Sequence, residues 1–233
     1  MRIADRNWLQ VEEYLRTDDR IVLPVGSTEQ HAYLSLATDS ILAERVSIEA
    51  ADPLGVLVLP AMPFGLAPGF AAFPGSVSLR PETLVAVVSE VLGTLQGQGF
   101  RRFLVVNGHG GNDPVREPLE SWAAGRDGTR LLFHSWWDSP SVRAAAAEVY
   151  AGEATHASWF ENFPWTRLAG VELPLGEKPM VTDREALREL EPEAVKAAVG
   201  DGSYGGPYSV PDDQALKAWR AGVAEVTALI ESL

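Results

Sequence analysis

The stretch IVLPVGSTEQHAYLSLATDSILAERVSIEA, residues 21–50, contains a short apolar run, a polar loop and a helical repeat in succession. Ile21–Pro24 indicates a buried strand, because apolar residues stand together without alternation. Thr38–Ala50 predicts a helix, since Thr38 or Asp39 can cap its start and Ala, Leu and Val recur at helical spacing. A strand followed by a loop and a helix is the unit from which α/β folds are built.

The same alternation continues along the rest of the chain. Apolar runs predict further strands at Val56–Leu59, Phe103–Val106 and Leu131–His134. Helical patterns predict helices at Pro81–Gly97, Asp113–Ala124, Ser141–Tyr150 and Asp212–Leu233. Gly and Pro predict a loop from Gly65 to Gly75 and an extended surface or interface segment over 170–211. We therefore expect one α/β domain over residues 1–233, with a mostly parallel sheet covered by helices on both faces.

Composition excludes several classes of protein. The chain has 233 residues and no cysteine, so disulfides, thiolate metal sites and thiol nucleophiles are excluded. A net charge of −13 repels phosphate backbones, so we expect no nucleic-acid partner. No apolar stretch approaches the roughly 18 residues of a membrane span, and the charged start lacks the apolar core of a signal peptide. We expect no membrane partner and a cytoplasmic location.

Polar residues around the first predicted loop favour a metal site. Residues two apart in extended backbone point the same way, so Glu29 and His31 can face one point in space. Asp39 begins the following helix, whose N-terminus favours the carboxylate form that a metal needs. Imidazole and carboxylates without thiolate suit Zn²⁺, Mn²⁺ or Fe²⁺. Each residue alone would be interpreted as a helix cap or a loop residue, but the three together favour a site.

Two later clusters add candidates. Three glycines surround His109 directly after an apolar strand, and a bare turn would not need the histidine. A phosphate-binding loop is the alternative there, although no lysine follows it. His156 is a candidate proton shuttle and Glu161 a candidate metal ligand, but a helix start with a capping interaction explains this third cluster equally well. Trp137 follows the fourth strand and is a candidate wall of a substrate pocket.

Several of these motifs together resemble the creatininase (creatinine amidohydrolase) family. They are LPVGSTEQH at 23–31, Thr38-Asp39, VNGHGGN at 106–112, the His156-Ala157…Glu161 pattern and GGPY at 205–208. The resemblance covers nearly the whole chain. It implies a three-layer αβα fold, a homohexamer built as a trimer of dimers, and two divalent metal ions per subunit. It also implies hydrolysis of a C–N bond in a small amide, lactam or formamide by a metal-bridging water.

The resemblance also implies roles for individual residues. Glu29 and His109 would bind one metal, His31 would bind the other, and Asp39 would bridge them. His156 matches the catalytic histidine that passes a proton to the leaving nitrogen. Gly111 occupies the position at which creatininase carries a glutamate ligand of the second metal. Glu161 is then the natural replacement, as a metal ligand and as a member of the catalytic set with His156.

Two further departures from the family pattern concern the substrate. The loop between the Glu-Gln-His run and Asp39 is one residue shorter than usual, and Tyr33 stands near the family's extra histidine. Trp159 stands where the usual His-Ala-Gly-Glu motif has an acid. We therefore predict a substrate pocket containing Trp137, Tyr33 and Trp159, and leave the substrate open.

Two other interpretations remain open. The first is a family peptidase. The second is a family member that kept the fold and lost the chemistry, and that acts in ligand binding or assembly. The loss of an acid at Trp159 is the main sequence support for the inactive form.

Overall fold

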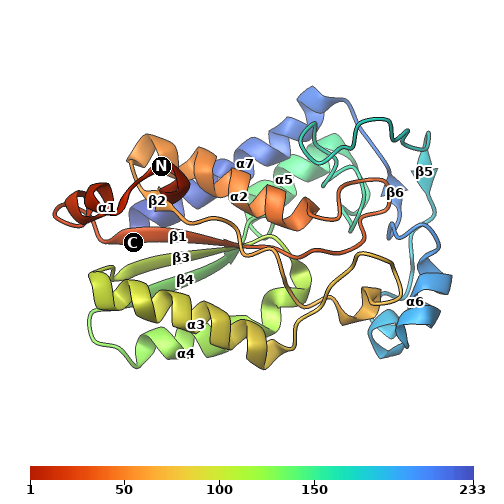
Figure 1. The fold of residues 1–233 in the computed structure, drawn as a ribbon. Coiled ribbons are helices and arrows are strands. Elements are labelled where there is room, and N and C mark those ends of the chain that lie inside the picture. The colour runs from red at the N-terminus through yellow and green to blue at the C-terminus, as the bar shows by residue number, and fades with distance from the viewer.

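The computed structural model describes residues 1–233, and its centre is a parallel sheet (Figure 1). The strands lie in the order β2-β1-β3-β4, and β1 and β4 both pair in parallel with β3. Their bounds are Arg20–Val25 for β1, Leu57–Val58 for β2, Arg102–Asn107 for β3 and Arg130–Ser135 for β4. Each of these strands overlaps a predicted one, so the apolar runs located the sheet correctly.

Alternate residues of β3 enter two separate cores. Leu104 and Val106 belong to a core on one face of the sheet, whereas Phe103 and Val105 belong to a core on the other face. Successive side chains of a strand point to opposite faces, so a strand that is covered on both faces must be apolar at every position. This is why the sequence shows continuous apolar runs instead of an alternating pattern.

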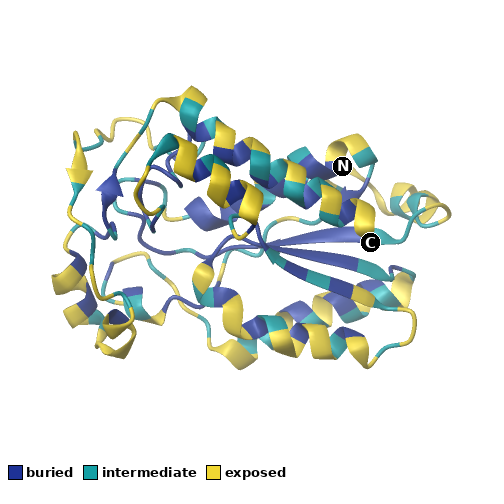
Figure 2. Cartoon of the chain, turned by 180° about the vertical axis from the view of Figure 1, so that it is seen from behind, coloured by how far each residue is buried: buried dark blue, intermediate teal, exposed yellow.

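Helices cover both faces of the sheet, as Figure 1 shows. One face carries α2 (Thr38–Ala51), α5 (Pro140–Val149) and α7 (Asp212–Ser232), and the other carries α3 (Pro81–Gln98) and α4 (Arg116–Ala124). The exposed residues of these helices face outward and the buried ones face the sheet (Figure 2). The predicted three-layer αβα fold is thus confirmed. None of the helices is both long enough and apolar enough to cross a bilayer.

Two helices were not predicted from the sequence. The first, α1 (Trp8–Tyr14), starts with a reciprocal cap in which the side chains of Asn7 and Gln10 each accept from the other's backbone N–H. The second, α6 (Pro192–Val199), lies in segment 170–211, where only extended backbone was expected. Both are too short for a helical period to stand out in the sequence.

Segment 170–211 is therefore more structured than the sequence suggested. Val195 and Val199 of α6 pack in a small core with Phe70 and Phe73 of the predicted glycine-rich loop. A two-stranded antiparallel sheet joins β5 (Glu177–Lys178) to β6 (Gly206–Pro207). The remaining short elements are 3-10 turns at Ile3–Asp5, Asp52–Leu54, Pro68–Phe70, Gly110–Val115 and Ala186–Glu189.

The parallel sheet also decides where the polar loops lie. The carboxyl ends of β1, β3 and β4 lie at one edge, which brings residues 26–31, 107–112 and 135–138 to the same end of the molecule. Open α/β sheets bind ligands beyond this edge. The helix predicted from Asp113 starts later, because the glycine loop first forms the 3-10 turn that precedes α4.

Candidate metal centre

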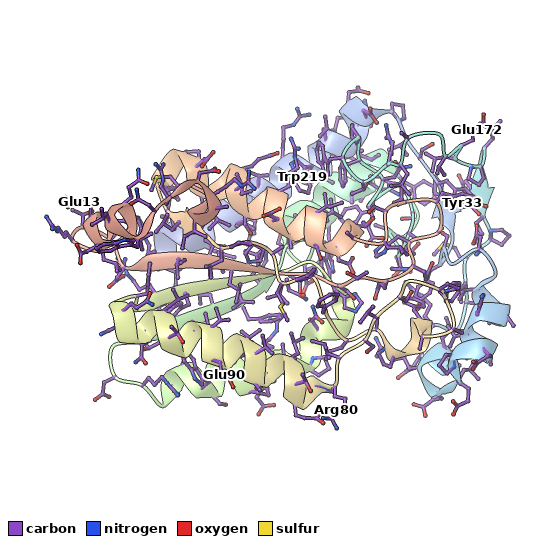
Figure 3. The ribbon with its side chains drawn as sticks, in the orientation of Figure 1. Glu13, Tyr33, Arg80, Glu90, Glu172 and Trp219 are labelled. Atoms are coloured by element: carbon purple, nitrogen blue, oxygen red, sulfur yellow. The ribbon has the colours of Figure 1, made fainter.

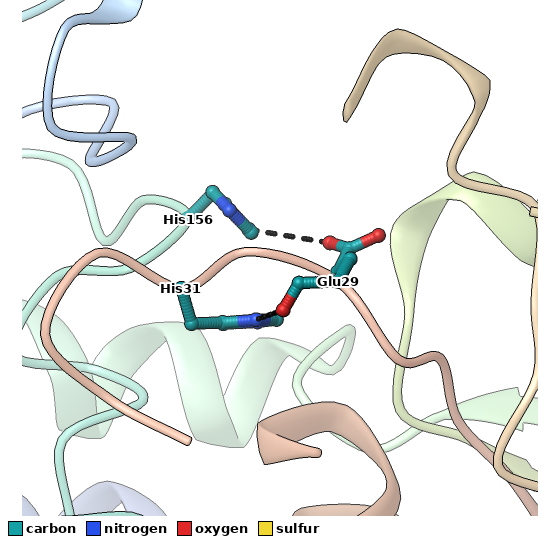
Figure 4. A group of neighbouring side chains, drawn as sticks. All are labelled: Glu29, His31 and His156. Atoms are coloured by element: carbon teal, nitrogen blue, oxygen red, sulfur yellow. Dashed lines mark hydrogen bonds and ion pairs between the residues drawn. The ribbon is translucent and has the colours of Figure 1, made fainter. Parts of the chain in front are cut away.

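Glu29 and His31 lie in the loop after β1, and both side chains are fully buried. Nδ1 of His31 donates to the main-chain oxygen of Glu29 at 3.1 Å, and this bond fixes the ring. Nε2 of His31 is then the nitrogen that faces the site, 3.0 Å from Oδ1 of Asp39. Figure 4 shows Glu29 and His31 gathered with the side chain of His156.

His109 approaches the same point from the glycine loop after β3. The side chain of Asn107 accepts from the backbone N–H of His109 at 3.1 Å and donates to its carbonyl at 2.8 Å, which shapes the loop. Nε2 of His109 donates to the carbonyl of Leu66 at 3.0 Å. Nδ1 is therefore the nitrogen that faces Oδ2 of Asp39, at 3.1 Å, while Oε2 of Glu29 lies 3.3 Å from Nε2.

The glycines around His109 are required by close packing. A Cβ atom on Gly108 would lie 2.2 Å from the main-chain oxygen of Asp39. A Cβ atom on Gly111 would lie 2.2 Å from the carbonyl oxygen of Leu66 and 2.3 Å from Nε2 of His109. Neither position has room for a side chain, so this loop cannot supply an additional ligand from position 111.

Asp39 lies between the two histidines, in the first turn of α2. One carboxylate oxygen faces His31 and the other faces His109. Burial would raise the pKa of Asp39, but the two imidazoles outweigh burial and hold it well below its usual range. Asp39 is thus placed to be shared by two neighbouring groups of ligands.

Glu161 completes the second of these groups. Its Oε2 atom lies 3.7 Å from Nε2 of His31 and accepts from the backbone N–H of Ala157 at 2.6 Å. Ala157 has a φ of 54°, a left-handed conformation that is strained for any residue other than glycine. Burial raises the pKa of Glu161 to about 7, with His31 opposing and Asp39 reinforcing the shift.

The two ligand histidines show the electrostatics of a cation site. Burial disfavours the charged imidazolium of His31, yet Asp39, Glu161 and Glu29 outweigh burial and raise its pKa to about 10. The pKa of His109 is also raised well above its usual value, against burial, by Glu29 and Asp39. Carboxylates that hold protons on buried imidazoles would stabilise a divalent cation in their place.

Unsatisfied buried atoms give an independent test of whether a metal fits. Oε1 of Glu29, Nε2 of His31 and Oδ2 of Asp39 are buried and have no hydrogen-bond partner. Such orphaned atoms are rare in folded proteins and require an explanation. The potential ligand atoms lie within 4.8 Å of one another in each of three groups: Glu29, Asp39 and His109; His31, Asp39 and Glu161; Glu29, His31 and His156. The residues present therefore fit divalent metal ions with N and O ligands.

His156 lies beside these ligands. Its Nδ1 atom faces Oε1 of Glu29 at 3.7 Å (Figure 4). Its ring stacks on Phe70, with ring centroids 5.0 Å apart, and contacts Tyr204 at 5.1 Å. Burial and the neighbouring imidazoles, His31 first, lower the pKa of His156 well below its usual value. Tyr204 was missed in the sequence, where the adjacent Gly205–Tyr208 stretch was the only signal for this region.

The predicted pocket residues have three different environments. Trp159 is 1% exposed and packs in the large core with Phe160, and its place in a substrate pocket stays a prediction. Trp137 is half-buried, next to Gly110 of the glycine loop. Tyr33 is half-buried too, and packs edge-on against Tyr208 away from the sheet (Figure 3). Trp137 and Tyr33 stay predictions.

Comparisons with known proteins agree with this arrangement of motifs. The family described as Creatininase, creatinine amidohydrolase, matches residues 4–230. A creatinine amidohydrolase from Pseudomonas putida is 28% identical over 161 residues, which cover 64% of this chain and 62% of that protein. A mycofactocin precursor peptide peptidase from Mycobacterium tuberculosis is 36% identical over 107 residues, covering 41% of this chain and 42% of that protein. The chain spans less than two thirds of either relative in these matches.

Solved structures show the same fold. The crystal structure of creatinine amidohydrolase (creatininase) has a TM-score of 0.80 at 22% identity and covers 99% of this chain and 96% of that chain. Other creatininase structures with this fold include one described as a Mn form and one as a Zn-Zn type.

Proposed function

The chain belongs to the creatininase family, and from that membership we propose that it is a metal-dependent amidohydrolase with two divalent ions per subunit. Its substrate is a small molecule with a C–N bond in an amide, lactam or formamide. One observation carries the proposal: the buried Asp39 is shared by two groups of potential metal ligands. Glu29 and His109 form one group with it, and His31 and Glu161 form the other.

The nature of the ligands supports Zn, Mn or Fe as the metal. All five are imidazole or carboxylate groups, and the chain has no cysteine. Related creatininase structures are described in Mn and Zn forms. Two such ions, when bound, activate water as a nucleophile and polarise a carbonyl group.

The chain's own residues would orient the ligands and move a proton. Hydrogen bonds from His31 to the Glu29 carbonyl and from His109 to the Leu66 carbonyl decide which nitrogen each ring offers. Nδ1 of His156 faces the ligand groups, and its low pKa keeps that atom available to receive a proton. The same atom can then give the proton to the leaving nitrogen, which would otherwise depart as an unstable anion. Phe70 stacks on one face of the His156 ring.

A peptidase is the second candidate function, favoured by the higher local identity to the mycobacterial peptide peptidase. A peptide substrate needs an open groove beside the site, whereas a small amide needs only a closed pocket. The inactive alternative still rests on the missing acid at position 159, where the ring of Trp159 packs in the large core.

The proposal is tested by measuring metal content and hydrolysis together. Wild-type protein loaded with Zn²⁺ or Mn²⁺ is assayed against a panel of small amides, lactams, formamides and short peptides, beside Asp39→Asn. We expect turnover of a panel member by the wild type and its loss, with less bound metal, in Asp39→Asn. Equal turnover by both proteins would contradict the proposal, and turnover of peptides alone would favour the peptidase.

We also propose, on the family resemblance, that the chain acts as a homohexamer in the cytoplasm. Exposed apolar side chains support burial against other subunits, notably Trp8 at 71% and Leu175 at 100% exposure. Light scattering coupled to gel filtration tests the hexamer, and a monomeric mass would contradict it.

A further inference from the structure

Tyr204 has a side chain beside the metal centre that the proposed chemistry does not use. Its ring contacts the ring of His156, with centroids 5.1 Å apart, and the ring of Phe70, with centroids 6.1 Å apart. The residue is half-buried, whereas its neighbours Ser203 and Gly205 are buried. Tyr204 is therefore the residue of this segment that stays accessible next to His156.

The backbone fixes where this ring stands. The N–H of Tyr204 donates to the carbonyl of His156 at 3.0 Å, and its carbonyl accepts from the N–H of Val181 at 2.9 Å. The next residue, Gly205, has a φ of 108°, and a Cβ atom there would lie 2.6 Å from Cα of Met180. Tyr204 is thus held by close-packed backbone and is tied to the same residue whose ring it contacts.

The hydroxyl of Tyr204 is free to bind another molecule. It has no hydrogen-bond partner in the protein, and it is not one of the buried polar atoms that lack a partner, so it is accessible. Burial raises the pKa of Tyr204 to about 12 and the carboxylate of Glu29 adds to the rise, which shows that the hydroxyl lies within electrostatic range of the ligands. A tyrosine hydroxyl can donate one hydrogen bond and also accept.

His156 indicates which part of a substrate would meet this hydroxyl. In the proposed function, Nδ1 of His156 gives a proton to the leaving nitrogen, while the carbonyl group faces the ligand groups around Asp39. The amine side of the scissile bond would then lie beside His156. Because Tyr204 contacts His156, its hydroxyl borders the groups attached to the leaving nitrogen.

We propose that Tyr204 is a substrate-binding residue whose hydroxyl donates a hydrogen bond to an acceptor on the amine side of the scissile C–N bond. The proposal rests on the proposed function, which decides how the substrate is oriented. It narrows the substrate class to amides, lactams or formamides with an oxygen or nitrogen acceptor close to the leaving nitrogen. A site that offers a hydrogen bond discriminates against analogues without the acceptor more strongly than apolar walls can.

Matched pairs of small molecules test this preference. The members of a pair differ only in a carboxamide or an isopropyl group of similar shape, attached one carbon from the nitrogen. The pairs are N-acetylglycinamide with N-isobutylacetamide, N-formylglycinamide with N-isobutylformamide, and pyroglutamide with the lactam that has isopropyl in place of its carboxamide. Hydrolysis and calorimetric binding are measured on zinc-loaded protein. We expect the wild type to favour the carboxamide member of a pair by about 10-fold in kcat/KM.

Tyr204→Phe removes the hydroxyl and keeps the ring contacts with His156 and Phe70. We expect it to lower kcat/KM for the carboxamide member about 10-fold and to leave the isopropyl member, the bound metal and the melting temperature unchanged. Tyr14→Phe is the matched control, because that hydroxyl donates to the carbonyl of Arg20 at the opposite end of β1. The control should show the reverse pattern, with a lower melting temperature and unchanged kcat/KM.

The outcomes separate this proposal from the proposed function. An equal loss for both members of a pair, or no loss for the carboxamide member, would overturn the role of Tyr204 in an active enzyme. If the wild type hydrolyses none of the six molecules, weaker binding of the carboxamides to Tyr204→Phe would keep that role and contradict the proposed function. Equal binding by the two proteins, or no binding by either, would then overturn both.

Discussion

Replacing Glu161 by Gln should stabilise the metal-free protein while weakening its proposed metal site. Burial, opposed by His31 and reinforced by Asp39, raises the pKa of Glu161 from 4.5 to about 7. A carboxyl group whose pKa is higher in the folded than in the unfolded chain destabilises the fold once it ionises. The penalty is absent below pH 4.5, grows as the pH rises to about 7, and is complete above that value.

The magnitude follows from the two pKa values. At about 1.4 kcal/mol per pH unit, the difference between 4.5 and about 7 corresponds to a penalty of roughly 3 kcal/mol. Glutamine carries no charge, so it avoids this penalty, and its side-chain oxygen can still accept from the N–H of Ala157. The gain in unfolding free energy should therefore approach this value in alkaline solution and vanish in acid.

Urea unfolding in the presence of a chelator measures this gain at acidic and alkaline pH. Glu120→Gln, an exposed substitution on α4, is the control and should show no pH-dependent gain. An unfolding free energy of Glu161→Gln that is no higher than that of the wild type in alkaline solution would refute this prediction. In metal-loaded protein we expect the same substitution to leave one bound ion instead of two and to lower kcat by about 100-fold or more.

Three further predictions concern the same site. Metal binding should release protons, because the pKa of His31 is about 10 without metal. The apparent metal affinity should therefore rise with pH up to that value. Titration calorimetry in buffers of different ionisation enthalpy measures the release, and no released proton would contradict the prediction. Gly111→Ala should lower the unfolding free energy by about 1–3 kcal/mol, because its Cβ would meet the Leu66 carbonyl. The control Gly97→Ala has open space in α3 and should be neutral or stabilising. Thermal unfolding measures both, and equal melting temperatures of the two variants would contradict the prediction. Ala157→Gly should relieve left-handed strain and be neutral to about 1 kcal/mol stabilising in urea, and a clear loss of stability would show that the residue is not strained.

The fold was largely predictable because strands that are buried on both faces of the sheet must be apolar at every position. Leu104 and Phe103 face different cores, yet both must be apolar, so the strand appears as an uninterrupted run. Helices α1 and α6 have no comparable hydrophobic pattern, because each has only about two turns. The start of α1 depends instead on a local cap at Asn7. Their positions follow from capping and tertiary contacts that hydrophobic periodicity does not report.

The candidate site was predictable where ligands are close in sequence and follow strands. Glu29 and His31 are two residues apart, and the parallel sheet brings His109 to them. The contacts of His156 were not predictable, because Phe70 and Tyr204 come from loops whose approach depends on three-dimensional packing. The core packing of Trp159 was not predictable for a similar reason, because the sequence does not report which neighbours surround a side chain in the fold.

Anomalous diffraction from crystals soaked in Mn²⁺ tests the central claim most directly. We predict two peaks, one on each side of Asp39: the first beside Glu29 and His109, the second beside His31 and Glu161. A single peak, peaks elsewhere, or no peak at these side chains would contradict a two-metal centre in this protein.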